Sequence, residues 1–269
     1  MREESNTGKN PIGVFDSGIG GLTILASIVS RMPHEDIIYY ADTANCPYGG
    51  REREEIIRIS DNVIKELEKE GAKVIVIACN TASISSSSEL RKKHPLPIVA
   101  TEPAVKPAVE NTGTGVIAVL ATQSTINSGQ IEKLASLYGK GVKVIRRAGG
   151  KLVELAEKGE TDGTEAYELL KELIIPAIEE NSDFLVLGCT HYPFFRDTIK
   201  AVLKDAGAPH VKVIDTAEPV AKRVEWILEN NGLLNGQETK GRIKFISSAG
   251  EEDSRRIENI FKIKFLKEK

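Results

Sequence analysis

The stretch VIVIACNTAS, from Val74 to Ser83, decides the fold that we expect for this chain. Its apolar residues run unbroken up to Ala78, as in a strand that is buried on both faces of a parallel sheet. The run then stops at Cys79, which Asn80 and Thr81 follow directly. Because ligands bind beyond the carboxyl ends of parallel strands, we expect these three side chains to lie at such an edge.

Similar apolar runs alternate with amphipathic segments along the whole chain. We expect strands at residues 12–15, 36–41, 73–78, 97–100, 115–120, 142–145, 183–188, 211–214 and 242–247. The clearest helix follows Gly50. Its apolar residues recur at spacings of three and four, as on one face of a helix: Ile56, Ile59, Val63 and Leu67. The alternation predicts an α/β fold with mostly parallel sheets flanked by helices.

A weak internal repeat predicts two similar lobes. In the first half one strand ends at Asp16 and a later strand ends at Cys79. In the second half one strand ends at Thr122 and a later strand, at nearly the same separation, ends at Cys189. Each half therefore supplies one polar strand end and one cysteine strand end.

The prolines of TEPAVKP, residues 101–107, mark the boundary between the lobes. We expect a first α/β lobe made of residues 1–101 plus 213–269, since the last strand and helices can return to it. The second α/β lobe is then residues 102–212. We expect the active site in the cleft between the two lobes.

Composition excludes several classes of partner. The 269 residues include 36 basic and 39 acidic ones, a net charge of −3 without a long run of either sign, so we expect no nucleic acid and no membrane as partner. No apolar stretch reaches the ~18 residues that a spanning helix requires. The N-terminal MREESNTGKN is polar and is unlike a signal peptide, so we expect a cytoplasmic protein.

The three cysteines and four histidines do not suggest a metal or disulfide framework. No C-x-x-C is present and the histidines lack zinc-ligand spacing, so we expect reduced thiols and no metal. Cys46 has no counterpart in the second half, and we interpret it as structural. His34, His94 and His210 lie beside prolines in expected surface turns, and we assign them no role.

A pair of facing thiols can perform chemistry that neither performs alone. A lone cysteine that closes a strand is usually small core filler, but Cys79 and Cys189 occur in matching positions of the two halves. If the lobes close on a substrate, one thiolate can remove a proton from a carbon while the other thiol delivers a proton to the opposite face. This inverts the carbon centre. The neighbouring Asp16 and His191 can bias or shuttle protons.

VFDSGIGGL, residues 14–22, favours a competing class of protein. A strand followed by a glycine-rich turn and a helix is typical of phosphate-binding loops. However, neither G-x-G-x-x-G nor G-x-x-x-x-G-K-[ST] is present, and Asp16 would repel a phosphate. Asp16 and Ser17 suit the ammonium group of an amino acid better.

Two further junctions offer binding groups, each with a plain structural alternative. Pro47, Tyr48 and Gly49 form a tight turn whose amides can hold a carboxylate, or an ordinary capping turn. Thr122 and Thr125 stand where a strand meets a helix, where at least one hydroxyl is expected to serve as a helix N-cap.

Five motifs together resemble those of the glutamate racemase family, in order and over essentially the whole chain. They are FDSGIGGLTIL, YYADTANCPYGGRE, VIVIACNTAS, VLATQSTINSGQIEK and FLVLGCTHYPFF. The resemblance implies an isomerase that interconverts L- and D-glutamate without a cofactor and supplies D-glutamate for peptidoglycan. It also implies a homodimer, since members are often dimeric.

The resemblance also implies roles for individual residues. Cys79 and Cys189 match the acid/base pair, Cys79 acting on the D enantiomer and Cys189 on the L enantiomer, with Asp16 and His191 in support. The matching substrate-binding residues are Asp16, Ser17, Tyr48, Gly49, Asn80, Thr81, Thr190 and His191, and Pro47, Thr122 and Thr125 are further candidates.

Three alternatives remain at this point. Aspartate racemases share both cysteine motifs, but their second motif tends to place glutamate after Cys-Thr, where this chain has His191. A phosphate- or nucleotide-binding module would rest on the glycine turn and leave the cysteine pair unexplained. A lyase or amide hydrolase would need a single thiol and an oxyanion hole.

Overall fold

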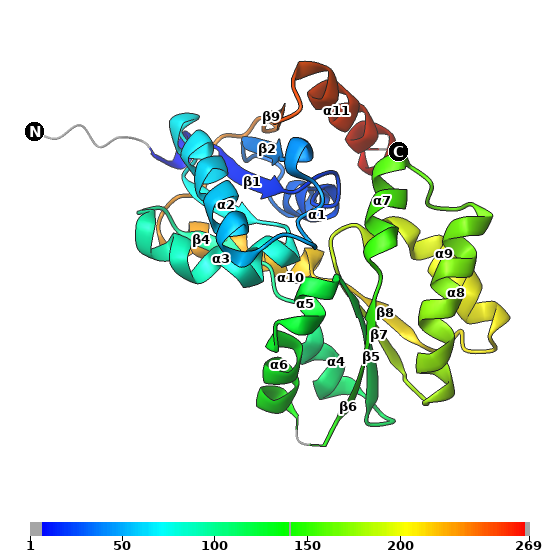
Figure 1. Cartoon of the computed structure of the whole chain (residues 1–269). Helices are drawn as coiled ribbons and strands as arrows, with labels where there is room; N and C mark the ends of the chain where they lie inside the picture. The colour runs from blue at the N-terminus through cyan, green and yellow to red at the C-terminus, as the bar shows by residue number, and fades with distance from the viewer. Residues whose placement is uncertain (1–6, 140, 267–269) are drawn as a thin grey trace, which may run out of the picture. The chain divides into compact units, whose positions relative to one another are not determined.

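Nine strands form two separate parallel sheets in the computed structural model, which describes residues 7–139 and 141–266. The chain divides into two units around these sheets (Figure 1). The first unit is Met1–Thr101 with Ala217–Lys269, and the second is Glu102–Thr216. Each of the nine predicted strands overlaps an observed one, so the α/β prediction is confirmed.

The sheet of the first unit has the order β4-β3-β1-β2-β9. Its strands are β1 (Ile12–Asp16), β2 (Ile37–Ala41), β3 (Val74–Ile77), β4 (Ile98–Ala100) and β9 (Ile243–Ser247). Every residue of β1 and β3 is buried, as the unbroken apolar runs predicted. All neighbouring strands pair in parallel, so their carboxyl ends lie at one edge.

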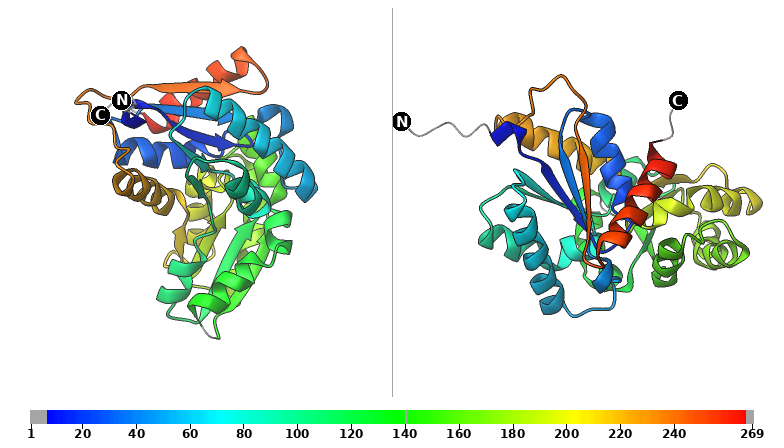
Figure 2. Two further views of the ribbon diagram at one scale, coloured as in Figure 1. Left: turned by 90° about the vertical axis from the view of Figure 1, so that its left-hand side faces the viewer. Right: turned by 90° about the horizontal axis from the view of Figure 1, so that it is seen from above.

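Helices cover both faces of this sheet. On one face α2 (Arg53–Lys69) and α3 (Asn80–Lys93) pack together, and on the other α1 (Leu22–Arg31) packs on α10 (Ala217–Asn230) and α11 (Glu251–Phe265). The predicted apolar stripe of α2 is confirmed, because Ile56, Ile59, Val63 and Leu67 are all buried. Figure 2 shows α11 running along the edge strand β9.

The serine-rich helix α3 packs against the sheet by satisfying its hydroxyls locally. Ser83 Oγ donates to the carbonyl of Ile77 (2.9 Å) and accepts from the amide of Thr101 (2.9 Å). Ser86 Oγ donates to the carbonyl of Ala82 (2.6 Å). Buried hydroxyls with hydrogen bonds of this kind carry little desolvation cost, which explains how this sequence forms a packed helix.

The second unit repeats four strands of the first in the same order. Its strands are β5 (Val116–Ala121), β6 (Lys143–Ala148), β7 (Phe184–Gly188) and β8 (Lys212–Ile214). They lie in the order β8-β7-β5-β6, which matches β4-β3-β1-β2 strand for strand. The two cysteine motifs thus follow equivalent strands, β3 and β7, and the two-lobe prediction is confirmed. β9 has no counterpart.

Helices also cover both faces of the second sheet (Figure 1). On one face α4 (Val105–Asn111) packs on α6 (Gln130–Tyr138), next to the short α5 (Gln123–Asn127). On the other face α8 (Thr164–Glu179) packs on α7 (Gly150–Lys158) and α9 (Arg196–Asp205). The apolar core between sheet and α4 contains Val105, Ala108, Ile117, Val119 and Ile131.

The break at Thr101 coincides with the predicted proline-rich boundary, but the return of the chain lies later than predicted. Residue 213, the predicted start of the returning segment, falls within β8. β8 pairs with β7, so the second unit keeps the chain up to Thr216. The reason is that backbone pairing of an edge strand holds its residues in the sheet that they complete.

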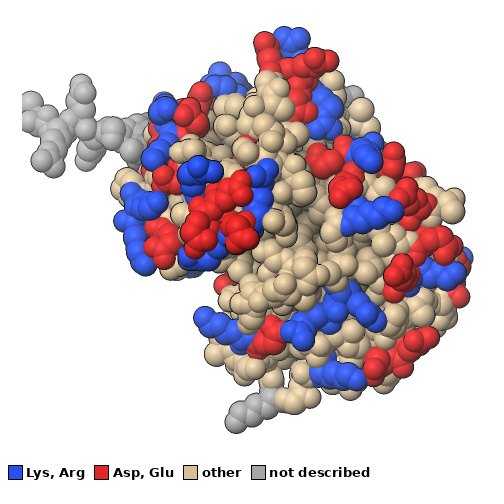
Figure 3. Space-filling model, viewed as in Figure 1, with Lys and Arg blue, Asp and Glu red and all other residues tan. Residues whose placement is uncertain are grey.

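Two features of the described residues bear on possible partners. On the face that Figure 3 draws, basic and acidic side chains are intermixed without a large area of one sign. Within residues 7–139 and 141–266, no helix is both long enough and apolar enough to cross a membrane.

Candidate active site

A polar cluster lies at the carboxyl ends of the strands in each unit. We call the first the Cys79 cluster, made of Asp16, Ser17, Tyr48, Cys79 and Asn80. We call the second the Cys189 cluster, made of Thr122, Glu157, Cys189, Thr190 and His191. The two are described separately below.

Asp16 ends β1 inside the first unit. Its carboxylate is fully buried and accepts hydrogen bonds from the amide of Gly18 (3.0 Å) and from Ser17 Oγ (3.5 Å). The turn is held from β2 by Tyr39, whose hydroxyl donates to the carbonyl of Gly18 (2.7 Å). A side chain at Gly21 would meet Asp16 and Tyr39 within 2.8 Å, so the glycine keeps this turn close to the sheet.

Cys79 is the N-cap of α3 and is 6% exposed. Its sulfur accepts a hydrogen bond from the amide of Ala82 (3.5 Å), and it lies 3.8 Å from Ser17 Oγ, to which the thiol can donate. Exposed amides and the helix dipole favour negative charge at a helix N-terminus. This position therefore stabilises a thiolate at Cys79.

Asn80 follows as the first residue of α3 and is 2% exposed. Its Nδ2 and Oδ1 have no hydrogen-bond partner among the described residues. Buried polar groups are nearly always hydrogen-bonded, and leaving one unpaired costs about 1–3 kcal/mol. An amide held in this way next to a thiol is suited to a ligand with both a donor and an acceptor. Thr81 beside it is also buried.

The loop between β2 and α2 brings Tyr48 to the same place. The Tyr48 hydroxyl donates to Asp42 Oδ2 (2.6 Å), and Asn45 Nδ2 donates to the same carboxylate (3.0 Å). Burial raises the pKa of Tyr48 far above its ordinary value, and the charges of Asp42, Cys79 and Asp16 raise it further. Tyr48 therefore stays protonated, and it lies close enough to Cys79 and Asp16 for their charges to act on it.

In the second unit, Cys189 directly follows β7 and begins a relay of three side chains. Its sulfur lies 3.8 Å from His191 Nδ1, and His191 Nε2 lies 2.7 Å from Glu157 Oε1 on α7. Cys189 and His191 are 6% and 2% exposed. A carboxylate on one ring nitrogen orients the imidazole and stabilises its protonated form, so that the other nitrogen can exchange a proton with the sulfur.

Glu157 is the residue that sequence reasoning missed. It lies in α7, 34 residues before His191, among other polar residues of an amphipathic helix. No spacing relates the two residues, because the sheet brings them together. Glu157 would be indistinguishable from Glu154 in the same helix without the structure.

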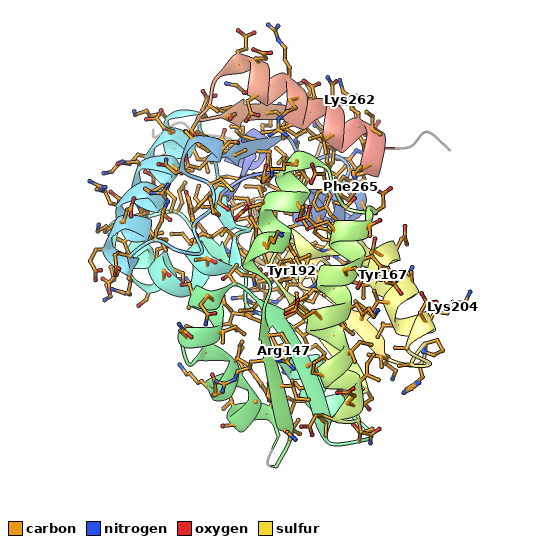
Figure 4. All side chains as sticks on the ribbon, turned by 45° about the vertical axis from the view of Figure 1, so that its right-hand side comes forward. Arg147, Tyr167, Tyr192, Lys204, Lys262 and Phe265 are labelled. Atoms are coloured by element: carbon orange, nitrogen blue, oxygen red, sulfur yellow. The ribbon has the colours of Figure 1, made fainter. Side chains whose placement is uncertain are left out.

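The remaining residues of the second cluster are buried around Cys189. Thr122 caps α5 by accepting the amide of Thr125 (3.4 Å), and its hydroxyl donates to Thr125 Oγ1 (3.1 Å), so the expected N-cap is present. Thr190 is 4% exposed. Tyr192, labelled in Figure 4, lies in the interior of this unit, where burial and then the charge of Cys189 raise its pKa.

The residues singled out from the sequence differ in how deeply the structure buries them. In the first unit Gly49 is half-buried and Pro47 is exposed, whereas Tyr48 between them is buried. Cys46 is half-buried and reduced. The expectation that His94 lies at the surface is wrong: its side chain is buried between Asp61 (3.1 Å) and Glu68 (3.0 Å), because it caps α3 where that helix packs on α2.

Comparison with known proteins gives consistent matches. The family model for Asp/Glu/Hydantoin racemase matches residues 16–224. The glutamate racemase of Herpetosiphon aurantiacus is 42% identical over 238 residues, 88% of this chain and 92% of that protein. The crystal structure of a Francisella tularensis glutamate racemase with D-glutamate has a TM-score of 0.81 at 32% identity, covering 94% of each chain.

A third match is the Escherichia coli glutamate racemase, solved with L-glutamate and the activator UDP-MurNAc-Ala. It has a TM-score of 0.78 at 26% identity and covers 94% of this chain and 95% of its own. The two parallel sheets with their cysteine strand ends are thus those of an isomerase. The chain belongs to the Asp/Glu/Hydantoin racemase family, and the resemblance of its five motifs is confirmed.

Proposed function

We propose that the protein interconverts L- and D-glutamate, with Cys79 and Cys189 as the two proton-transferring groups. The single observation that carries this proposal is the matched placement of the two cysteines. Each is buried just beyond the carboxyl end of an equivalent strand, and each has a hydrogen-bonding side chain 3.8 Å from its sulfur, the Ser17 hydroxyl in one unit and the His191 imidazole in the other.

The reaction balances with one thiolate and one thiol and no other reagent. For L-glutamate, the Cys189 thiolate takes the α-proton, and the Cys79 thiol gives its proton to the opposite face of the same carbon. The product is D-glutamate, with Cys189 now a thiol and Cys79 a thiolate, which is the state needed for the reverse direction. The proposal requires both sulfur atoms to reach opposite faces of one α-carbon.

The side chains around the sulfurs have complementary tasks. The α-proton of an amino acid is weakly acidic, so the carbanion character that develops needs fixed donors in a dry site. In the first unit, the buried Asn80 amide and the Thr81 hydroxyl beside it are suited to this task, and the Asp16 carboxylate is suited to the ammonium group. In the Cys189 cluster, the His191–Glu157 pair supports the second sulfur.

Racemisation followed by circular dichroism tests the proposal. The purified protein should convert L-glutamate to a racemic mixture without an added cofactor, and should act much more slowly on L-aspartate. Cys79→Ser and Cys189→Ser should each abolish racemisation, whereas Cys46→Ser should retain most of it. Faster turnover of aspartate, or an active Cys79→Ser variant, would overturn the proposal.

We further propose that the enzyme works in the cytoplasm as a homodimer that supplies D-glutamate for peptidoglycan. The support is the similarity to bacterial glutamate racemases. Sedimentation should give about twice the chain mass of 29.3 kDa. Depletion of the protein in its host should make growth depend on added D-glutamate.

A further inference from the structure

The loop that carries Tyr48 and Gly49 is unusually long for its place in the fold. Eleven residues, 42–52, separate β2 from α2, whereas the equivalent strand of the second unit, β6, reaches α7 through the single residue Gly149. Connections in α/β units normally have 2–6 residues, and longer ones are usually functional. A long loop that binds a ligand also needs something to hold it in place.

The start of this loop is hydrogen-bonded to a segment about 200 residues later in the sequence. The amide of Ala44 donates to Ser248 Oγ (3.0 Å), and the amide of Ser248 donates to the carbonyl of Ala41 (3.0 Å). The parallel pairing of β2 with β9 sets this contact, because it places Ser247 directly opposite Ala41, where β2 ends. β9 is the strand that has no counterpart in the second unit.

Asp253, in the first turn of α11, is hydrogen-bonded to the end of β9 and, through it, contacts the start of the loop. Its carboxylate accepts from Ser247 Oγ (2.6 Å) and from Arg256 Nε (2.7 Å), and Ser247 Oγ lies 3.4 Å from Thr43 Oγ1. Burial acts to raise the pKa of Asp253, but hydrogen bonds from Ser247, Arg256 and Thr43 outweigh burial and lower it. The group is therefore an anion at neutral pH.

The contact continues inward to the Cys79 cluster. Thr43 is the first residue of the short turn Thr43–Asn45. At the end of this turn Asn45 donates to the Asp42 carboxylate, which also accepts a hydrogen bond from the Tyr48 hydroxyl. Two carboxylates thus hold the loop: Asp42 hydrogen-bonds to Asn45 and Tyr48 within it, and Asp253 contacts its first residues through Ser247. Figure 4 labels Lys262 and Phe265 on α11, the helix that packs on β9.

We propose that the junction of β9 with α11 positions the substrate loop, with Asp253 as the positioning residue that acts through Thr43. This inference rests on the proposed function, because it assumes that Tyr48 and Gly49 hold the substrate. Asp253 itself touches neither the cysteines nor the substrate. Its effect is on binding of both enantiomers alike, because one loop serves both directions of the reaction.

Asp253→Asn tests this role, with Glu252→Gln as the matched control. Both variants remove one negative charge from the first turn of α11, but Glu252 is exposed and Asp253 is partly buried at the contact. We expect Asp253→Asn to raise KM about tenfold for both L- and D-glutamate, with kcat changed less than about twofold, since it weakens positioning and not proton transfer. Glu252→Gln should keep wild-type constants.

Variants of Thr43 keep the test informative if Asp253→Asn folds poorly. Thr43→Val preserves shape but removes the hydroxyl, and should raise KM as Asp253→Asn does, while Thr43→Ser should restore it. The double variant Thr43→Val/Asp253→Asn should be no worse than the more severe single one, because both break the same contact.

The outcomes separate the two proposals. A wild-type protein that does not racemise glutamate overturns the proposed function and this inference with it. An active wild type whose Asp253→Asn and Thr43→Val variants keep the KM of Glu252→Gln overturns the inference alone. So does a change confined to kcat.

Discussion

Replacing Asn80 by Ala should make the free protein more stable and much less active. In most proteins the loss of a buried polar side chain lowers stability, because its partners are left unpaired. Asn80 differs, since neither its Nδ2 nor its Oδ1 has a partner among the described residues although the side chain is buried. This cost of burying an unpaired amide disappears when the amide is removed by mutation, or when a bound substrate forms hydrogen bonds with it.

The size of both effects follows from these two groups. Each unpaired buried group costs at least about 1 kcal/mol, or about 2 kcal/mol together. The packing lost with the amide costs about 1 kcal/mol. The net gain is thus about 1 kcal/mol, or a rise in Tm of about 2–4 °C. Hydrogen bonds to a charged ligand contribute about 1.5–3 kcal/mol each, so kcat/KM should fall about 10²- to 10⁴-fold.

Ser60 supplies the matched control for stability. It is fully buried in α2 of the same unit, and its Oγ has no partner among the described residues. Ser60→Ala should therefore also raise the Tm, but should leave kcat/KM unchanged because Ser60 is not part of the Cys79 cluster. The assay is thermal unfolding without ligand, combined with racemisation kinetics. Wild-type kcat/KM for Asn80→Ala, or a loss of stability above about 1 kcal/mol, would refute the reasoning.

Three further predictions concern a buried ion pair, the turn after β1 and a carboxylate at the amino end of β7. Lys73→Met should lower the free energy of unfolding by about 3–5 kcal/mol in urea titrations, because it leaves the buried Glu35 carboxylate without its ion-pair partner; a loss below about 1 kcal/mol would contradict this. Tyr39→Phe removes the hydroxyl that holds the glycine turn after β1, and should lower both stability, by about 1 kcal/mol, and kcat/KM; unchanged kinetics would argue against the role of this turn. Burial acts to raise the pKa of Asp183, but hydrogen bonds from neighbouring hydroxyl and amide groups outweigh this effect, so the pKa lies below its ordinary value. Its stabilising contribution is thus complete above the ordinary carboxyl pKa and is lost as the pH falls through the lowered one, so Asp183→Asn should flatten the fall of Tm below about pH 4; a parallel fall would exclude this.

The parts of the fold that were predictable are those in which local pattern and burial agree. The unbroken apolar runs of β1, β3, β5 and β7 could only suit strands covered on both faces, and the spacing of Ile56 to Leu67 could only suit one helix face. Both Cys79 and Cys189 could be placed at a sheet edge, because a strand end determines where the next residue lies.

The parts that were missed depend on contacts between distant segments. Glu157 is paired with His191 because α7 packs against the turn Tyr192–Phe195 that follows His191, which no spacing encodes. His94 stands beside a proline, as surface residues often do, yet two carboxylates of α2 bury it. The role proposed for Asp253 likewise depends on the pairing of β9 with β2.

Incorporation of deuterium from the solvent at low conversion tests the central claim most directly. L-Glutamate in deuterated water, stopped at low conversion, should give D-glutamate with deuterium at the α-carbon, while the remaining L-glutamate keeps its proton. This result is expected when Cys189 removes the proton and Cys79 delivers a different one from the opposite face. D-Glutamate that retains the original proton would show that one group both removes and returns it, and would contradict the two-cysteine account.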